Sequence, residues 1–104
     1  MIFSEEILKK VVHFGILSYP VDKSLNILDL PSELEEQFIT DFNNPKSEVA
    51  KNYKKGQDKA EYAIDIKLFE MAKEGDLKAI KEYELRKKNR EKLSKNTDDF
   101  DDDY

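Results

Sequence analysis

The sequence LFEMAKEGDLKAI at residues 68–80 contains the turn that decides the fold. Gly75 is typical of the residue that follows a helix, because glycine adopts a positive φ angle without a steric clash. Asp76 is typical of a helix N-cap, because its carboxylate accepts hydrogen bonds from the first free amides of the next helix. The pair predicts two helices that reverse direction through a minimal turn. We therefore expect a long helical hairpin over residues 44–95.

The first helix of this hairpin is predicted to begin with Asn44 as its N-cap and Pro45 at its first position, and to run to about Glu74. Its apolar residues recur at helical spacing along one main stripe. This stripe contains Val49, Tyr53, Ala60, Ile64, Leu68 and Met71. Three further apolar residues fall on the opposite side, namely Tyr62, Ile66 and Phe69. One short partner helix cannot cover both sides, so the second half of this helix requires burial on two faces.

The second helix of the hairpin is predicted to begin near Leu77 and to pack Leu77, Ile80 and Tyr83 against the first. Beyond Tyr83 the apolar stripe ends. Only ion-pair spacings, such as that from Glu82 to Arg86, support a helix there. We expect this end of the helix to fray.

Residues 96–104 form a separate acidic segment with five aspartates and no basic side chain. Such a composition cannot bury enough apolar surface to order the chain, so we expect a disordered tail. Phe100 and Tyr104 are aromatic side chains in this acidic setting, and they are the predicted anchors of a short motif that binds a partner protein. A tail that serves only solubility is the alternative.

Residues 1–43 predict three short helices in a helix-turn-helix-like arrangement. The first helix is expected over residues 5–14, with Ser4 as its N-cap and Gly15 as the residue that ends it. A second short helix is expected to start near Asp22. Ordinary three-helix packing, without any role in reading DNA, is the alternative.

The third of these helices is predicted from Ser32 and Glu35, which have the spacing of a capping box, and it extends to about Phe42. It carries glutamates and no basic residue. Its middle and its C-terminal end offer polar side chains that can hydrogen-bond to base edges. These are Gln37, Thr40 and Asn43.

The composition predicts an all-α protein without catalytic chemistry. Among 104 residues there are only 3 Gly and 3 Pro, and 39% of the residues are charged. The absence of cysteine and the single His13 argue against a zinc site, and no phosphate loop or nucleophile motif is present. We therefore expect a binding protein rather than an enzyme, with no metal and no cofactor. No stretch approaches the ~20 apolar residues of a membrane span, so we expect an intracellular protein.

The net charge of −5 conceals a strong alternation along the chain. Residues 51–60 carry four lysines against one aspartate, and residues 81–95 carry seven basic side chains against three acidic ones. The lysines of the first group are candidates for contacts with DNA phosphates, each of which adds salt-dependent affinity. A solvated helix face is the alternative for this group.

The whole arrangement resembles the small terminase subunit of tailed bacteriophages. The resemblance covers about Ser4 to Tyr83 and rests on three motifs. They are Phe42-Asn43-Asn44-Pro45, then Tyr53-Lys54-Lys55-Gly56 with Ala60, and then residues 68–76 with Ala79 and Ile80. These resemble the family's proline-led entry into a long helix, its mid-helix glycine and the turn of its helical hairpin.

The resemblance implies a protein of the host cell cytoplasm that binds double-stranded viral DNA, forms a ring-shaped homo-oligomer and recruits or regulates the large terminase subunit. That large subunit holds the ATPase and the nuclease. The predicted DNA-binding residues are Gln37, Thr40, Asn43, Lys46, Lys51, Lys54 and Lys55. The resemblance also implies that the hairpin over residues 44–95 is the oligomerisation region, with Tyr62, Ile66 and Phe69 as its predicted contact surface. Two alternatives are a helix-turn-helix transcriptional regulator, which more naturally forms a dimer, and a helical adaptor that binds only protein.

Overall fold

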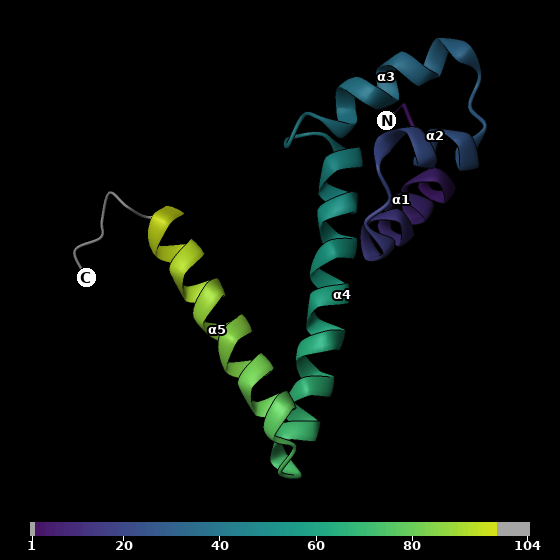
Figure 1. Ribbon diagram of the computed structural model, residues 1–104. Coiled ribbons are helices and arrows are strands. Elements are labelled where there is room, and N and C mark those ends of the chain that lie inside the picture. The colour runs from purple at the N-terminus through teal and green to yellow at the C-terminus, as the bar shows by residue number, and fades with distance from the viewer. Residues whose placement is uncertain (1, 98–104) are drawn as a thin grey trace. The chain divides into compact units, whose positions relative to one another are not determined.

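The computed structural model describes residues 2–97, with side chains described as far as Lys92, and over this range the chain is all-helical (Figure 1). The five helices are α1 (Glu5–Leu17), α2 (Val21–Leu28), α3 (Ser32–Phe42), α4 (Glu48–Lys73) and α5 (Leu77–Thr97). The predicted all-α class is thereby confirmed, and so is the order of three short helices followed by two long ones. None of these helices is long and apolar enough to span a membrane.

The chain divides into two compact units within α4. The first unit, residues 1–62, contains α1, α2, α3 and the first half of α4, and the second unit begins at Ala63. The first half of α4 thus packs with the three short helices. A close contact between α1 and α4 explains this, as described below.

The core of the first unit is made by residues from α1, α3, α4 and the segment before α1. Its buried apolar side chains are Phe3, Leu8, Val11, Phe14, Phe38 and Val49. The rings of Phe3 and Phe38 meet edge to face, with centroids 5.7 Å apart, which is a preferred geometry for two aromatic rings. Val11 and Phe38 have no exposed surface, so they mark the centre of this core.

Two glycines bring α1 and α4 into direct backbone contact. A side-chain carbon added at Gly15 would overlap with the carbonyl oxygen of Tyr53, and one added at Gly56 would overlap with that of Val12. The prediction that Gly15 ends the first helix is therefore wrong. The helix continues to Leu17 and ends at Ser18, whose φ angle is 57°. Gly15 is present because α4 passes too close for any side chain.

The start of α3 differs from the predicted capping box. Ser32 is the first helical residue, and Pro31 occupies the cap position without any side-chain hydrogen bond. The amide of Leu34 donates to the carbonyl oxygen of Pro31 at 2.8 Å, so the backbone satisfies this amide instead. The turn from α2 passes through Asp29, which has a φ angle of 52°.

The start of α4 also differs from the prediction, because Ser47 and not Asn44 is the cap. The hydroxyl of Ser47 accepts from the amide of Ala50 at 3.0 Å and donates to the carbonyl oxygen of Asp41 at 2.5 Å. It therefore caps α4 and ties it to the end of α3. Asn44 instead stabilises the intervening turn, since its side chain accepts from the amide of Lys46 at 3.1 Å.

The turn between α4 and α5 forms as predicted. Gly75 has a φ angle of 93°, and the carboxylate of Asp76 accepts from the amide of Ala79 at 3.0 Å. The expected packing of Leu77 is wrong, because 74% of this residue is exposed. Leu77 is the first residue of α5, and Ala79, two residues later, is buried.

The second helix of the hairpin is longer than expected. It extends to Thr97, so its last two residues lie within the segment that was predicted to be a tail. The remaining residues of that segment, 98–104, lie outside the part of the chain that the structure describes.

Candidate nucleic-acid interface

Four lysines of α4 form an exposed strip on the first unit, which we call the lysine strip. It consists of Lys51, Lys54, Lys55 and Lys59. Lys51, Lys55 and Lys59 follow one another at intervals of four residues, and Lys54 lies beside Lys55, so all four fall on one side of a helix with 3.6 residues per turn. Lys54 pairs with Asp58 at 3.2 Å, but both side chains are more than half exposed, so this ion pair adds little stability. The other three lysines form no ion pair with any described residue.

A groove lies where α3 ends and α4 begins, and we call it the α3–α4 groove. Its volume is about 530 Å³. It is lined by Phe42, Asn43, Pro45, Ala50, Lys51, Tyr53, Lys54 and Gln57. The aromatic, proline and alanine residues give it an apolar floor, and the two lysines give it a positive rim. Two residues of the lysine strip therefore border an apolar depression.

A second hollow follows on the same helix. It has a volume of about 430 Å³ and is lined by Lys51, Lys54, Lys55, Asp58, Lys59 and Tyr62. Because Lys51 and Lys54 border both hollows, the groove and the lysine strip are parts of one continuous surface. Only one acidic residue, Asp58, lines either of them. The surface can attract an anion along its whole length.

Tyr53 fixes the floor of the groove to the rest of the first unit. Its hydroxyl donates to the carbonyl oxygen of Tyr19 at 2.8 Å, and its ring meets that of Phe42 with centroids 4.8 Å apart. Burial raises the pKa of Tyr53 above its ordinary value of 10.0, because the protein solvates a phenolate poorly. The hydroxyl therefore stays protonated and remains a hydrogen-bond donor.

The polar residues predicted to read base edges are partly engaged within the chain. The side-chain amide of Gln37 donates to the carboxylate of Asp41 at 2.8 Å, and that of Asn43 donates to the carbonyl oxygen of Ile39 at 2.9 Å. Thr40 is exposed. Of these predicted residues, Asn43 lines the α3–α4 groove together with lysines of the strip.

Helix α3 differs from the lysine strip in charge, because its charged residues are acidic. The helix contains three glutamates and Asp41 but no basic residue. Lys46, the remaining predicted contact, is an exposed residue of the turn between α3 and α4. The structure therefore brings Asn43, Lys51 and Lys54 together around one groove, with Lys55 next to it. Gln37 and Thr40 are not among the residues that line it.

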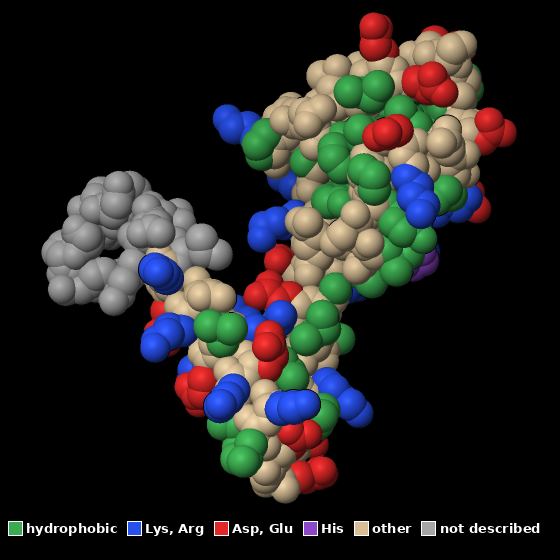
Figure 2. Space-filling model, in the orientation of Figure 1, with side chains coloured by type: hydrophobic (Ala, Val, Ile, Leu, Met, Phe, Trp, Pro, Cys, Tyr) green, Lys and Arg blue, Asp and Glu red, His purple; other side chains and the backbone are tan. Residues whose placement is uncertain are grey.

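The residues predicted for oligomerisation are all exposed, but they are not equivalent. Tyr62 is 68% exposed, Ile66 is 42% exposed and Phe69 is 40% exposed. Phe69 also packs within its own hairpin, since its ring centroid lies 5.7 Å from that of Tyr83 on α5. Phe69 therefore contributes to the fold of the second unit as well as to its surface. Figure 2 shows apolar side chains exposed among charged ones on the α4–α5 hairpin.

Asp65 holds the hairpin together, and this residue was not singled out from the sequence. Its two carboxylate oxygens accept from Arg86 at 2.7 Å and from Arg90 at 2.5 Å. The sequence signal is one of symmetry about the turn, because Asp65 and Arg86 lie equally far before Gly75 and after Asp76. The sequence spacing predicts an ion pair of Arg86 only with Glu82, within the same helix.

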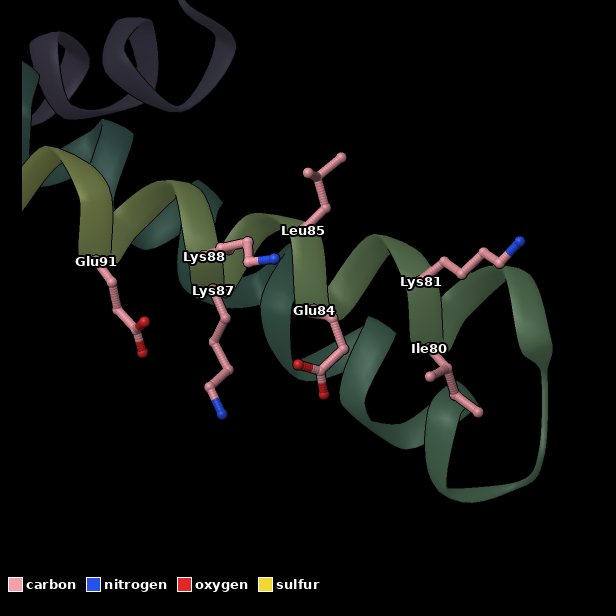
Figure 3. Close-up of a pocket in the computed structure, with 7 residues that line it drawn as sticks. All are labelled: Ile80, Lys81, Glu84, Leu85, Lys87, Lys88 and Glu91. Atoms are coloured by element: carbon pink, nitrogen blue, oxygen red, sulfur yellow. The ribbon is translucent and has the colours of Figure 1, made fainter.

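A further hollow lies along α5 and carries mixed charge. Its volume is about 490 Å³, and it is lined by Ile80, Lys81, Glu84, Leu85, Lys87, Lys88 and Glu91. Figure 3 shows Glu84, Lys87 and Glu91 pointing to one side of the helix, whereas Leu85 points to the other. Glutamates stand between the lysines here, so this surface is less suited to a phosphate backbone than the lysine strip.

The remaining candidate sites are a metal site and the predicted partner-binding residues. The described residues contain no group of histidine and carboxylate side chains that could hold a metal ion. The predicted partner-binding residues Phe100 and Tyr104 lie outside the described residues. Comparison of the chain with protein-family models, with curated proteins and with solved structures finds no match in any of the three. The functional argument therefore rests on the surface of the molecule.

Proposed function

We propose that this chain is a non-catalytic small terminase subunit of a tailed bacteriophage. In this role it binds double-stranded viral DNA, assembles into a homo-oligomer and recruits or regulates the large terminase subunit that packages the genome. The observation that carries the proposal is the lysine strip of α4 with its adjoining groove, a surface that can follow a phosphate backbone.

The lysine strip supports DNA binding through phosphates rather than through bases. Each lysine that neutralises a phosphate releases condensed counterions, and this release supplies sequence-independent affinity. A single copy offers four such lysines, which is a weak site by itself. Several copies in one assembly raise the affinity by avidity without any new contact. The proposed DNA binding therefore depends on the proposed assembly, because one copy alone binds DNA weakly.

The exposed apolar residues of the hairpin support assembly. Ile64, Ile66 and Phe69 are each at least 40% exposed, and they stand on more than one side of α4. Among the described residues of the second unit, Ala79 is the only buried apolar side chain. A hairpin with so small a core gains stability when a second copy covers its apolar faces.

The helix-turn-helix regulator is a weaker candidate, because α3 stands where the recognition helix would be. A recognition helix needs side chains free to reach base edges and a charge that tolerates phosphates. The acidic residues of α3 and the internal hydrogen bonds of Gln37 and Asn43 argue against that use. The adaptor that binds only protein differs in a simple way, since it has no salt-dependent affinity for DNA.

DNA affinity as a function of salt tests the proposal. The full chain is titrated into a fluorescent duplex of random sequence, and anisotropy is followed between about 50 and 200 mM salt. Four phosphate contacts per copy predict a slope of about −3 to −4 per bound copy in a plot of log K against log salt. An absence of binding at the lowest salt concentration would overturn the proposal and favour the adaptor.

A further inference from the structure

We propose that the α3–α4 groove binds the acidic C-terminal heptapeptide, residues 98–104 of the chain. This inference gives the groove an occupant of its own and does not depend on the DNA-packaging role. It rests on two properties of the groove that a single ligand must satisfy together. These are its apolar floor and its positive rim.

The apolar floor requires an apolar group to fill it. Phe42 and Tyr53 lie against each other with ring centroids 4.8 Å apart, and Pro45 and Ala50 complete the lining beside them. Both rings are only partly buried. The volume of about 530 Å³ lies in the range of ligand pockets, so the groove accepts side chains rather than a whole helix. Phosphodiester groups alone leave such a floor uncovered.

The rim requires negative charge. Among the described residues, Lys51 forms no ion pair, and Lys54 pairs only with the exposed carboxylate of Asp58. Lys55 lies next to Lys54 and borders the second hollow. No acidic residue lines the groove itself, so nothing in its lining offsets these charges.

The C-terminal heptapeptide supplies both properties in one short stretch. Its sequence, DDFDDDY, contains five aspartates and two aromatic residues, Phe100 and Tyr104. The aromatics can cover the floor while the aspartates face the rim lysines, which is how acidic motifs with aromatic anchors are recognised. The acidic helix α3 cannot supply this combination, because Phe38 has no exposed surface and Phe42 is itself part of the groove lining.

A free peptide tests this binding in trans. The receptor is the full chain with every aspartate of residues 98–104 changed to asparagine, which removes competition from the chain's own segment while keeping its length. The probe is a fluorescent peptide with the sequence NTDDFDDDY, which is that of residues 96–104. Fluorescence anisotropy is recorded without DNA, so a failure here is separate from a failure of the proposed DNA binding.

We expect saturable binding to which the lysines of the rim and the aromatic side chains of the peptide contribute separately. Changing Lys51→Glu and Lys54→Glu together weakens binding at least about tenfold, because two attractive contacts become repulsive. The matched control Lys9→Glu with Lys10→Glu, on exposed positions of α1, changes binding less than about twofold, since the net charge changes equally at positions that do not line the groove. A peptide with alanine at both aromatic positions binds at least about fivefold more weakly to the unchanged receptor.

Three results would overturn the inference. They are an absence of saturable binding, an equal loss in the groove variant and in the control variant, and full binding of the peptide without aromatic residues. The last result means that charge alone attracts the peptide and that the groove is not its site. The comparison of the two peptides needs no substitution in the folded part of the receptor, so it can be made even if the groove variant fails to fold.

Discussion

At the scale of single residues, Gly15 and Gly56 set the distance between α1 and α4. Both are buried, and each faces the backbone of the other helix. Glycine in a helix is normally less favourable than alanine by about 1 kcal/mol, so its presence at a crossing of two helices reflects packing. The sequence pattern favours a helix end at Gly15, because the sequence alone does not distinguish a glycine that ends a helix from one that lies at a crossing of two helices.

Gly56→Ala is expected to destabilise the first unit by about 1–3 kcal/mol, although alanine is the better helix former, because its side chain overlaps with the backbone of α1. The free energy of unfolding is measured by urea denaturation followed by circular dichroism. The control is Lys55→Ala at the neighbouring exposed position, which is expected to change it by less than about 0.5 kcal/mol. Unchanged or increased stability of Gly56→Ala would contradict the close crossing.

Tyr53→Phe removes one hydrogen bond and keeps the ring. We expect a loss of about 1 kcal/mol at neutral pH, because the carbonyl oxygen of Tyr19 loses its donor. The pKa of Tyr53 is raised in the folded state, so the stability that its neutral form contributes is present below pH 10.0 and is lost as the pH rises further. The gap between wild type and variant in urea denaturation should therefore narrow above that pH. A gap that widens would refute this assignment.

At the scale of elements, the hairpin turn could be predicted because its signals are local. Gly75 and Asp76 act on amides and carbonyls within a few residues, and the structure places both as expected. The start of α4 could not be predicted in the same way. Ser47 is its cap because the same hydroxyl reaches the carbonyl oxygen of Asp41 on α3, a contact that exists only in the folded unit.

The candidate site shows the same division between local and long-range information. The lysine strip follows from helical spacing alone, so Lys51, Lys54 and Lys55 could be predicted as a group. The α3–α4 groove could not, because it requires the angle at which α4 leaves α3. The engagement of Gln37 by Asp41 is local, at a spacing of four residues, and was available from the sequence.

Asp65→Asn tests the ion pairs that hold α4 and α5 together. We expect the free energy of unfolding of the hairpin, measured by thermal denaturation, to fall by about 1 kcal/mol. Asp65 and Arg86 are each only about a quarter exposed, and they form a network with Arg90. The matched control is Asp58→Asn, which breaks the exposed pair with Lys54 and is expected to change stability by less than about 0.5 kcal/mol. Equal effects of the two substitutions would show that the hairpin does not depend on Asp65.

At the scale of the whole molecule, the distribution of apolar residues is the feature on which the proposed assembly rests. Both units expose large apolar residues, but the first unit has a core of six buried apolar side chains, whereas Ala79 is the only buried apolar residue described in the second unit. An exposed apolar surface of this kind is typical of an interface. Assembly through the hairpin is therefore proposed for the second unit, whereas DNA binding is proposed for the lysine strip of the first unit.

Ile66→Glu is expected to lower the native mass from that of an assembly of many copies to that of a monomer or dimer, because a charge is placed in an apolar interface. Ile66 is preferable to Phe69, whose ring also packs against Tyr83 within the hairpin. Light scattering gives the mass, and circular dichroism checks that the helices persist. The control Ile27→Glu, at a similarly exposed apolar position on α2, should leave the mass unchanged. A full-sized assembly of the Ile66 variant would contradict the assignment of this surface.

The most direct test of the account is the DNA affinity of the full chain with Lys54→Glu and Lys55→Glu, measured beside Lys9→Glu with Lys10→Glu. Both variants change the net charge equally, and light scattering confirms that each keeps the wild-type mass. The account predicts that the first variant loses at least about tenfold in affinity and has a shallower salt slope, whereas the second stays within about twofold of wild type. Equal affinities for the two variants would contradict it, because the lysine strip would then be an ordinary solvated helix face.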